Sequence, residues 1–197
     1  GLSSNFGNMF SVLGAVLFLP FLPMLPVQIL LNNFLYDFSQ LSIPADSVDK
    51  EYIQRPKRWD NGFIARYMFL FGPISSIFDL MSYYVLYSVL HLSESAFQTG
   101  WFMESLATQV FVVYVIRTRL WPFIQSRPSV YVVLTTISAV AIGWMIPRLS
   151  LGAWFGFSAL PVNVTLMIGG IVLAYLVTAE ISKRIFYGLG WAEFTQQ

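Results

Sequence analysis

Residues 2–43 read LSSNFGNMFSVLGAVLFLPFLPMLPVQILLNNFLYDFSQLSI and hold a single charged side chain, Asp37. At about 1.5 Å of rise per residue, a helix of this length is twice as long as is needed to cross about 30 Å of hydrocarbon. The chain must therefore fold back, and the prolines at positions 20, 23 and 26 mark the break because proline interrupts a helix. This stretch predicts one membrane span at about residues 2–22 and a second at about 25–43.

Four further apolar segments follow and predict spans at about residues 64–90, 98–116, 129–147 and 160–181. The predicted fold is therefore all-α: a polytopic membrane protein with a bundle of six transmembrane helices. No basic stretch precedes the first apolar run, which argues against an amino-terminal signal peptide.

The overall composition agrees with a membrane protein. Of the 197 residues, 56% are hydrophobic and only 11% are charged, less than half the proportion usual in soluble domains. A net charge of +1 provides no broad basic face, so we expect no nucleic-acid partner. The absence of cysteine excludes disulfides and thiol chemistry, and a single histidine, His91, excludes a multi-histidine metal site.

The basic residues predict the orientation of the chain. Arg148 is the only one on the side of the loops that follow spans one, three and five. The other ten lie on the opposite side: Lys50, Arg55, Lys57, Arg58, Arg66, Arg117, Arg119, Arg127, Lys183 and Arg184. Because positive residues concentrate in cytoplasmic loops, both termini are expected in the cytoplasm.

Polar side chains at membrane depth are the candidate functional residues, since burying an ionisable group in a bilayer costs at least about 2.5 kcal/mol. Asn33 and Asp37 are four residues apart and share one face of the second span, while Asn5 and Asn8 share a face of the first. Carboxylate and amide oxygens converging from two helices suit a hard cation such as Mg²⁺ or Ca²⁺. The alternative is that the asparagines only join helices by hydrogen bonds.

Two further carboxylates lie in later spans. Asp79 has serine and tyrosine hydroxyls within one turn on its own helix, which favours a structural hydrogen-bond cluster. Glu104 lies early in the fourth span, with Gln109 five residues on, and either reaches the non-cytoplasmic interface or contributes to an ion path. Trp101 lies near a predicted span end, where an aromatic belt is expected.

Several motifs occur in a characteristic order along almost the whole chain. They are SNFGN at 4–8, FLPFLPMLP at 18–26, NFLYDFSQ at 33–40, FGPISSIFD at 71–79, RTR at 117–119 and PFIQSR at 122–127. With these motifs the chain resembles the carboxy-terminal membrane half of P-type ATPases, and most of all the bacterial magnesium-transporting subgroup. The resemblance implies that the six spans are the fifth to tenth membrane helices of such a pump.

The resemblance also implies roles for individual residues. Asn8, Asn33 and Asp37 match positions at which these pumps place ligands of the transported cation. Further candidates are Asn5, Glu104 and Gln109, the last near a position that supplies a ligand in some relatives. Many calcium and sodium pumps have a carboxylate in place of Asn8, so this chain is expected to bind one divalent ion.

The family's phosphorylated Asp-Lys-Thr-Gly-Thr loop does not occur in this sequence. The resemblance therefore implies a fragment that cannot hydrolyse ATP by itself and whose partners are membrane lipid and the amino-terminal part of the pump. That part would supply membrane helices one to four, the phosphorylation domain and the nucleotide-binding domain. The implied whole is an ATP-driven pump that imports Mg²⁺ across the inner, or plasma, membrane.

Two alternatives remain at this stage. The chain could be a membrane scaffold or a secondary permease that works alone, although permeases usually contain an internal repeat and none is detected here. Within the P-type family, the ion could instead be Ca²⁺, Na⁺ or H⁺, because selectivity depends on the size of the cavity and on helices outside this sequence.

Overall fold

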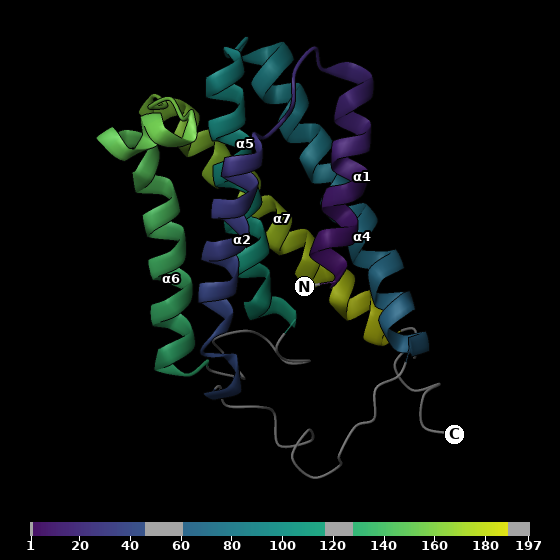
Figure 1. The fold of residues 1–197 in the computed structure, drawn as a ribbon. Coiled ribbons are helices and arrows are strands. Elements are labelled where there is room, and N and C mark those ends of the chain that lie inside the picture. Colours follow the sequence, from purple (N-terminus) through teal and green to yellow (C-terminus); the bar gives the residue numbers. More distant parts are fainter. Residues whose placement is uncertain (1, 46–60, 117–127, 189–197) are drawn as a thin grey trace.

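The computed structural model describes residues 2–45, 61–116 and 128–188, and these residues form helices joined by short connections, with no strand among them. The long helices are α1 (Leu2–Phe18), α2 (Pro26–Gln40), α4 (Asn61–Tyr84), α5 (Glu94–Ile116), α6 (Val130–Met145) and α7 (Val162–Gly188), which stand side by side in Figure 1. The all-α prediction is confirmed for this part of the chain. The segment 46–60, where the longest predicted polar loop falls, lies outside the described residues.

Four stretches of the described chain are long and apolar enough to cross a membrane. They are Met68–Val89, Glu94–Ile116, Val130–Arg148 and Val162–Phe186. The first of them ends in a five-residue π-helix, Val85–Val89, which continues α4. These helices establish a multi-pass membrane protein.

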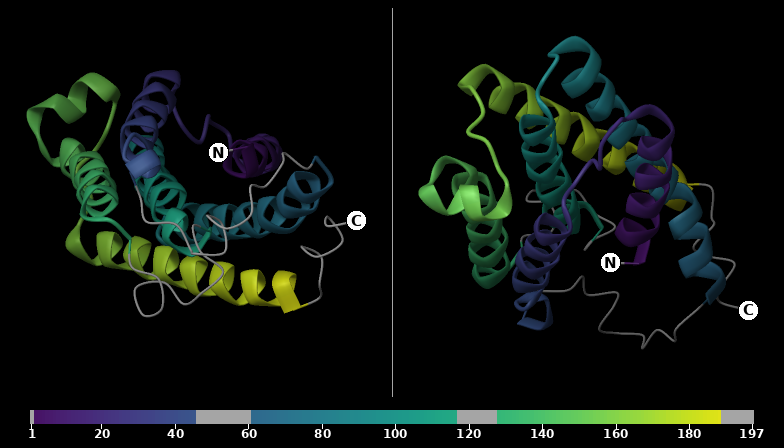
Figure 2. Two further views of the ribbon diagram at one scale, coloured as in Figure 1. Left: turned by 90° about the horizontal axis from the view of Figure 1, so that it is seen from below. Right: turned by 45° about the horizontal axis from the view of Figure 1, so that its top comes forward.

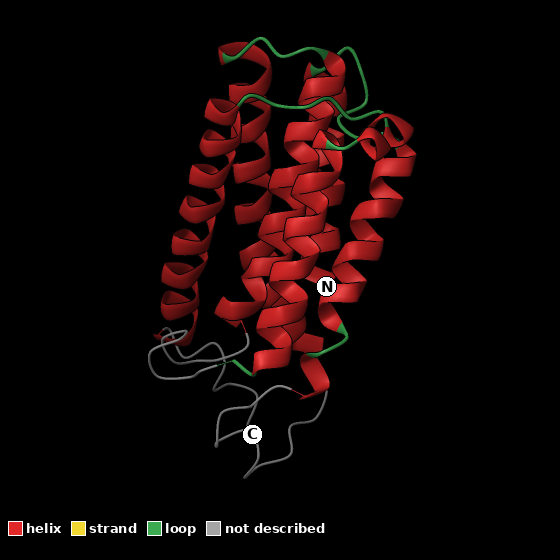
Figure 3. Cartoon of the chain, turned by 90° about the vertical axis from the view of Figure 1, so that its left-hand side faces the viewer, coloured by secondary structure: helices red, strands yellow, loops and turns green. Residues whose placement is uncertain are grey.

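The break predicted at the proline cluster is found between α1 and α2. Pro26 takes the first position of α2, where a proline ring costs no helical hydrogen bond. The Gln28 side chain reaches back and accepts a hydrogen bond from the Leu25 amide at 2.9 Å, so it caps the helix start. The chain therefore turns sharply here, and the α1–α2, α4–α5 and α6–α7 connections lie at one end of the bundle (Figures 1 and 3).

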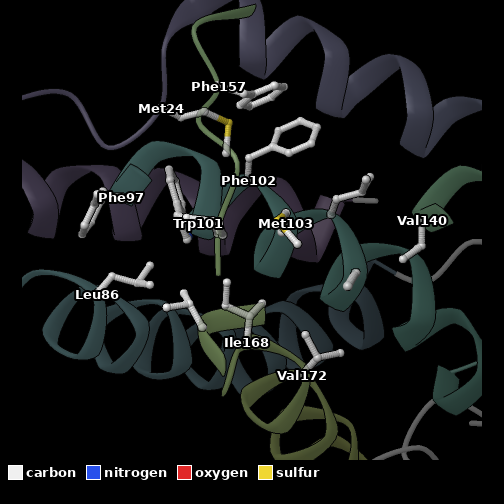
Figure 4. Close-up of a cluster of buried hydrophobic side chains, with 14 of the residues drawn as sticks. Met24, Leu86, Phe97, Trp101, Phe102, Met103, Val140, Phe157, Ile168 and Val172 are labelled. Atoms are coloured by element: carbon white, nitrogen blue, oxygen red, sulfur yellow. The ribbon is translucent and has the colours of Figure 1, made fainter. Parts of the chain in front are cut away.

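Helix α5 is the centre of the bundle. Most of its residues are buried, whereas only about a third of each of the other three membrane-spanning stretches is buried. It packs against α7, α6, α2 and α4, while α1 packs mainly on α4, an arrangement visible in the end-on view of Figure 2. Its side chains Trp101, Phe102 and Met103 form the middle of the apolar cluster in Figure 4, together with Ile168 and Val172 of α7.

Gly143 marks the closest approach of α6 to α5. A Cβ atom at this position would lie 2.2 Å from a methyl carbon of the fully buried Leu106 and 3.2 Å from one of Leu35. Gly143→Ala is expected to lower the free energy of unfolding by about 1–3 kcal/mol, because the core must shift to admit the methyl group. The measurement is the thermal midpoint of the purified protein in detergent.

Gly169→Ala on α7 is the matched control, because nothing lies within 4 Å of the added Cβ. This change removes only the intrinsic helix penalty of glycine, so it is expected to be neutral or stabilising by up to about 1 kcal/mol. Equal midpoints for the two variants would contradict the close contact at Gly143.

Candidate ion-binding site

The polar face of α2 points away from the described bundle. Asn33 and Asp37 are both exposed, and so is Phe34 between them. The opposite face of α2 is buried and carries Gln28, Asn32, Leu35 and Ser39. The spacing of four residues does bring Asn33 and Asp37 to the same side of the helix, as the sequence predicts.

The two candidate ligands of the first span lie on α1. Asn5 and Asn8 are within α1, and their side chains lie outside the described part of the chain. Helices α1 and α2 make little direct contact, because α1 rests on α4 and α2 rests on α6 and α5. The expected convergence of α1 and α2 on one ion is therefore not formed by the described residues alone.

Two of the further candidates on α5 have other neighbours. Gln109 is half-buried, and its Nε2 donates a hydrogen bond to the Ser105 hydroxyl at 3.1 Å. Glu104 is 1% exposed in the middle of the bundle, so of the two alternatives for this residue the one in which it reaches the membrane interface is wrong. Its carboxyl group lies against that of Asp79 on α4, rather than against Asp37.

Asp79 is held by donors from two other helices. The Ser11 hydroxyl of α1 donates to Asp79 Oδ2 at 2.5 Å, and the Trp101 indole N–H of α5 donates to Oδ1 at 3.2 Å. Trp101 is 3% exposed, so its predicted place in an interfacial belt is wrong. A buried carboxylate needs such partners to offset its lost hydration, which explains why three helices meet at this point.

Sequence reasoning did not identify Ser11 or Trp101 as part of a polar site. Both residues lie in hydrophobic stretches that give no sign of a polar contact. Their partner, Asp79, is 68 residues from Ser11 and 22 residues from Trp101. The available signal was Asp79 itself, since an intramembrane carboxylate requires donors from neighbouring helices. Within the described residues, no group of three or more His, Cys, Asp or Glu side chains gathers to form a metal site.

Comparison with known proteins places these features in a family. Residues 21–185 match the family model described as "Cation transporting ATPase, C-terminus". The chain is 42% identical over 96% of its length to the magnesium-transporting ATPase, P-type 1, of Salmonella typhimurium strain LT2, and 43% identical over 96% to the protein of the same name in Escherichia coli K12. It spans about a fifth of the length of these relatives (22% of each). The chain thus belongs to the cation-transporting P-type ATPases, and the part of that family to which it corresponds is the carboxy-terminal membrane region.

Proposed function

We propose that this chain is the membrane-transport part of an ATP-driven pump that imports Mg²⁺ into the cytosol across the inner, or plasma, membrane. In this proposal the relatives' transported ion is also the ion of this chain, and ATP is used only by the remainder of the pump. All six helices cross the membrane, and both termini lie in the cytoplasm.

The exposed polar face of α2 carries the proposal. Asp37 and Asn33 are exposed on a helix whose other exposed side chains include Ile29, Leu30 and Phe34. A carboxylate facing hydrocarbon is unfavourable, so this face requires a polar or ionic partner. We infer that the pump's other membrane helices cover it and that a cation occupies the covered space.

The ligand set follows from the chemistry of these side chains. Asp37 supplies a charged oxygen, and Asn33 and Asn8 supply neutral amide oxygens, a combination suited to one hard divalent ion that retains part of its water shell. Asn5 and Gln109 are further candidates at the edge of the site. Glu104 is left out of this set because it faces Asp79 inside the bundle.

ATP-driven transport is tested with the complete pump reconstituted in liposomes. We expect ATP-dependent Mg²⁺ movement, with ATP hydrolysis stimulated more by Mg²⁺ transport than by Ca²⁺, Na⁺ or a proton gradient. Movement that needs no ATP would support a secondary permease instead. Preference for another ion under the same conditions would retain the pump and overturn the magnesium assignment.

The proposed orientation gives a separate prediction, because this chain contains no native cysteine. Ser150→Cys lies at an exposed position near Arg148, at the end of the bundle with the short connections. Gly188→Cys lies at an exposed position at the end of α7. In intact cells, a membrane-impermeant maleimide is expected to label the first variant and not the second.

The control for this labelling is permeabilised cells, in which both variants should react. Labelling of Gly188→Cys alone in intact cells would reverse the orientation. Labelling of both variants in intact cells would contradict an odd number of crossings between the two positions.

A further inference from the structure

We propose that Asp79 and Glu104 form a buried proton-binding site, separate from the cation site on α2, in which the two carboxyl groups share one proton. The proton is bound to Glu104, and Asp79 is the ionised partner. This inference goes beyond the proposed transport function and does not depend on which ion is pumped.

The first observation is the direct pairing of two carboxyl groups in an apolar interior. Asp79 is 2% exposed and Glu104 is 1% exposed, and Trp101, which donates to Asp79, lies one turn before Glu104 on the same side of α5, so the two carboxyl groups face each other. Two carboxylates in contact at low dielectric repel strongly unless a proton or a cation lies between them. The pair therefore binds positive charge.

The second observation is the unequal distribution of hydrogen-bond donors. Asp79 accepts from the Ser11 hydroxyl and the Trp101 indole, one on each carboxyl oxygen. Neither carboxyl oxygen of Glu104 accepts a hydrogen bond from the described residues. Donors stabilise the ionised form of a carboxyl group, so Asp79 carries the charge and Glu104 is the neutral acid whose O–H donates to Asp79.

The third observation separates a proton from a metal ion. The groups that interact with the pair among the described residues are Ser11, Trp101, Tyr83 of α4 and Tyr175 of α7, and none is a cation. Ser11 and Trp101 each donate to one oxygen of Asp79, so both oxygens of that carboxylate already accept a hydrogen bond. A proton needs only these two carboxyl groups, whereas a hard metal ion takes about six oxygen ligands, and no third His, Cys, Asp or Glu side chain gathers with the pair among the described residues.

The Tyr83 hydroxyl is a further buried polar group at the site. Its hydroxyl is buried, lies near both carboxyl groups and has no hydrogen-bond partner in the described part of the chain. The side chain also lines an apolar cavity of about 350 Å³ between α1 and α4. The Tyr83 hydroxyl is therefore a buried polar group beside the pair that can hydrogen-bond to either carboxyl group.

Loading and unloading of the site transfer one proton between water and Glu104. Loading forms one O–H bond on Glu104 with a proton taken from water, and unloading breaks that bond and returns the proton to water. Ser11 is part of α1 and lies three residues after Asn8, the expected cation ligand of that helix. The Ser11–Asp79 hydrogen bond therefore joins α1 to the acidic pair in the interior of the bundle.

Infrared spectroscopy of the complete pump tests the assignment, because a neutral carboxylic acid has a C=O stretch distinct from that of a carboxylate. We expect the spectrum of Glu104→Gln at neutral pH to lack one carboxylic-acid band that the wild-type spectrum contains. Glu180→Gln is the matched control and should retain the band, because Glu180 is held as a carboxylate by Lys183 at 2.8 Å and Arg184 at 3.1 Å. The thermal midpoint of Glu104→Gln should equal that of wild type, since an amide can also donate to Asp79.

Asp79→Asn keeps the assignment testable if Glu104→Gln fails to fold. This variant retains the acid on Glu104 but removes its charged acceptor, so the band should remain and shift in frequency. A spectrum without the band in wild type, or with an unchanged band in Glu104→Gln, would overturn the proposal. Loss of the band on adding Mg²⁺ to wild type would identify the pair as a divalent-cation site and would equally overturn it.

Discussion

Asp37→Asn in the complete pump is expected to abolish Mg²⁺-stimulated ATP hydrolysis and Mg²⁺ uptake. Asp37 is the one carboxylate of α2, and the substitution keeps its size while removing the negative charge of the proposed site. Substituting a residue that only orients a metal ligand lowers metal affinity about 10–100-fold. Loss of the charged ligand itself should therefore lower the affinity for Mg²⁺ by more than this. The measurement is ATP hydrolysis as a function of Mg²⁺ concentration, together with uptake into liposomes.

Glu94→Gln is the matched control for this experiment. It makes the same carboxylate-to-amide change at an exposed position in the first turn of α5, at the end of the bundle. We expect its Mg²⁺ dependence to equal that of wild type. Retained stimulation in Asp37→Asn would remove Asp37 from the site, and equal losses in both variants would point to a general sensitivity to charge.

Gln28→Leu is expected to produce the largest loss of stability among the substitutions considered. The Gln28 side chain is fully buried, accepts from the Leu25 amide at 2.9 Å and donates to the Phe155 carbonyl oxygen at 2.9 Å. Leucine leaves both backbone groups without this partner, at about 1–3 kcal/mol for each buried group. The thermal midpoint of the purified protein should fall accordingly, by more than for Gly143→Ala.

The control is Gln40→Leu on the same helix, where the half-buried amide donates to the Ser39 hydroxyl at 3.2 Å. We expect its midpoint to remain close to that of wild type. A Gln28→Leu protein as stable as this control would mean that the hydrogen bonds of Gln28 to Leu25 and Phe155 do not stabilise the protein.

The helical character and the membrane class were predictable from the sequence because both depend on local properties. Long segments poor in charge can satisfy their backbone in lipid only as helices, so hydropathy is sufficient to predict them. The break before Pro26 was equally predictable, since the proline ring acts on its own helix. The shared face of Asn33 and Asp37 follows from the helical period alone.

The acidic pair was not predictable in the same way. Ser11, Asp79 and Glu104 come from three helices, and no pattern of spacing within one helix shows which neighbour each side chain will meet. Trp101 was expected at the membrane interface, and Glu104 either there or in an ion path, because both lie early in an apolar segment. The structure buries them because α5 passes through the centre of the bundle.

Hydropathy along the chain predicted a helical, multi-pass membrane protein, and the helical period predicted that Asp37 and Asn33 share one side of α2. The tertiary structure alone decided that α1 packs on α4 rather than on α2, that the side of α2 bearing Asp37 is open, and that Asp79 and Glu104 meet inside the bundle. The physical reason is that hydropathy and helical period act within a segment, whereas helix neighbours are chosen by the packing of side chains distant in the chain.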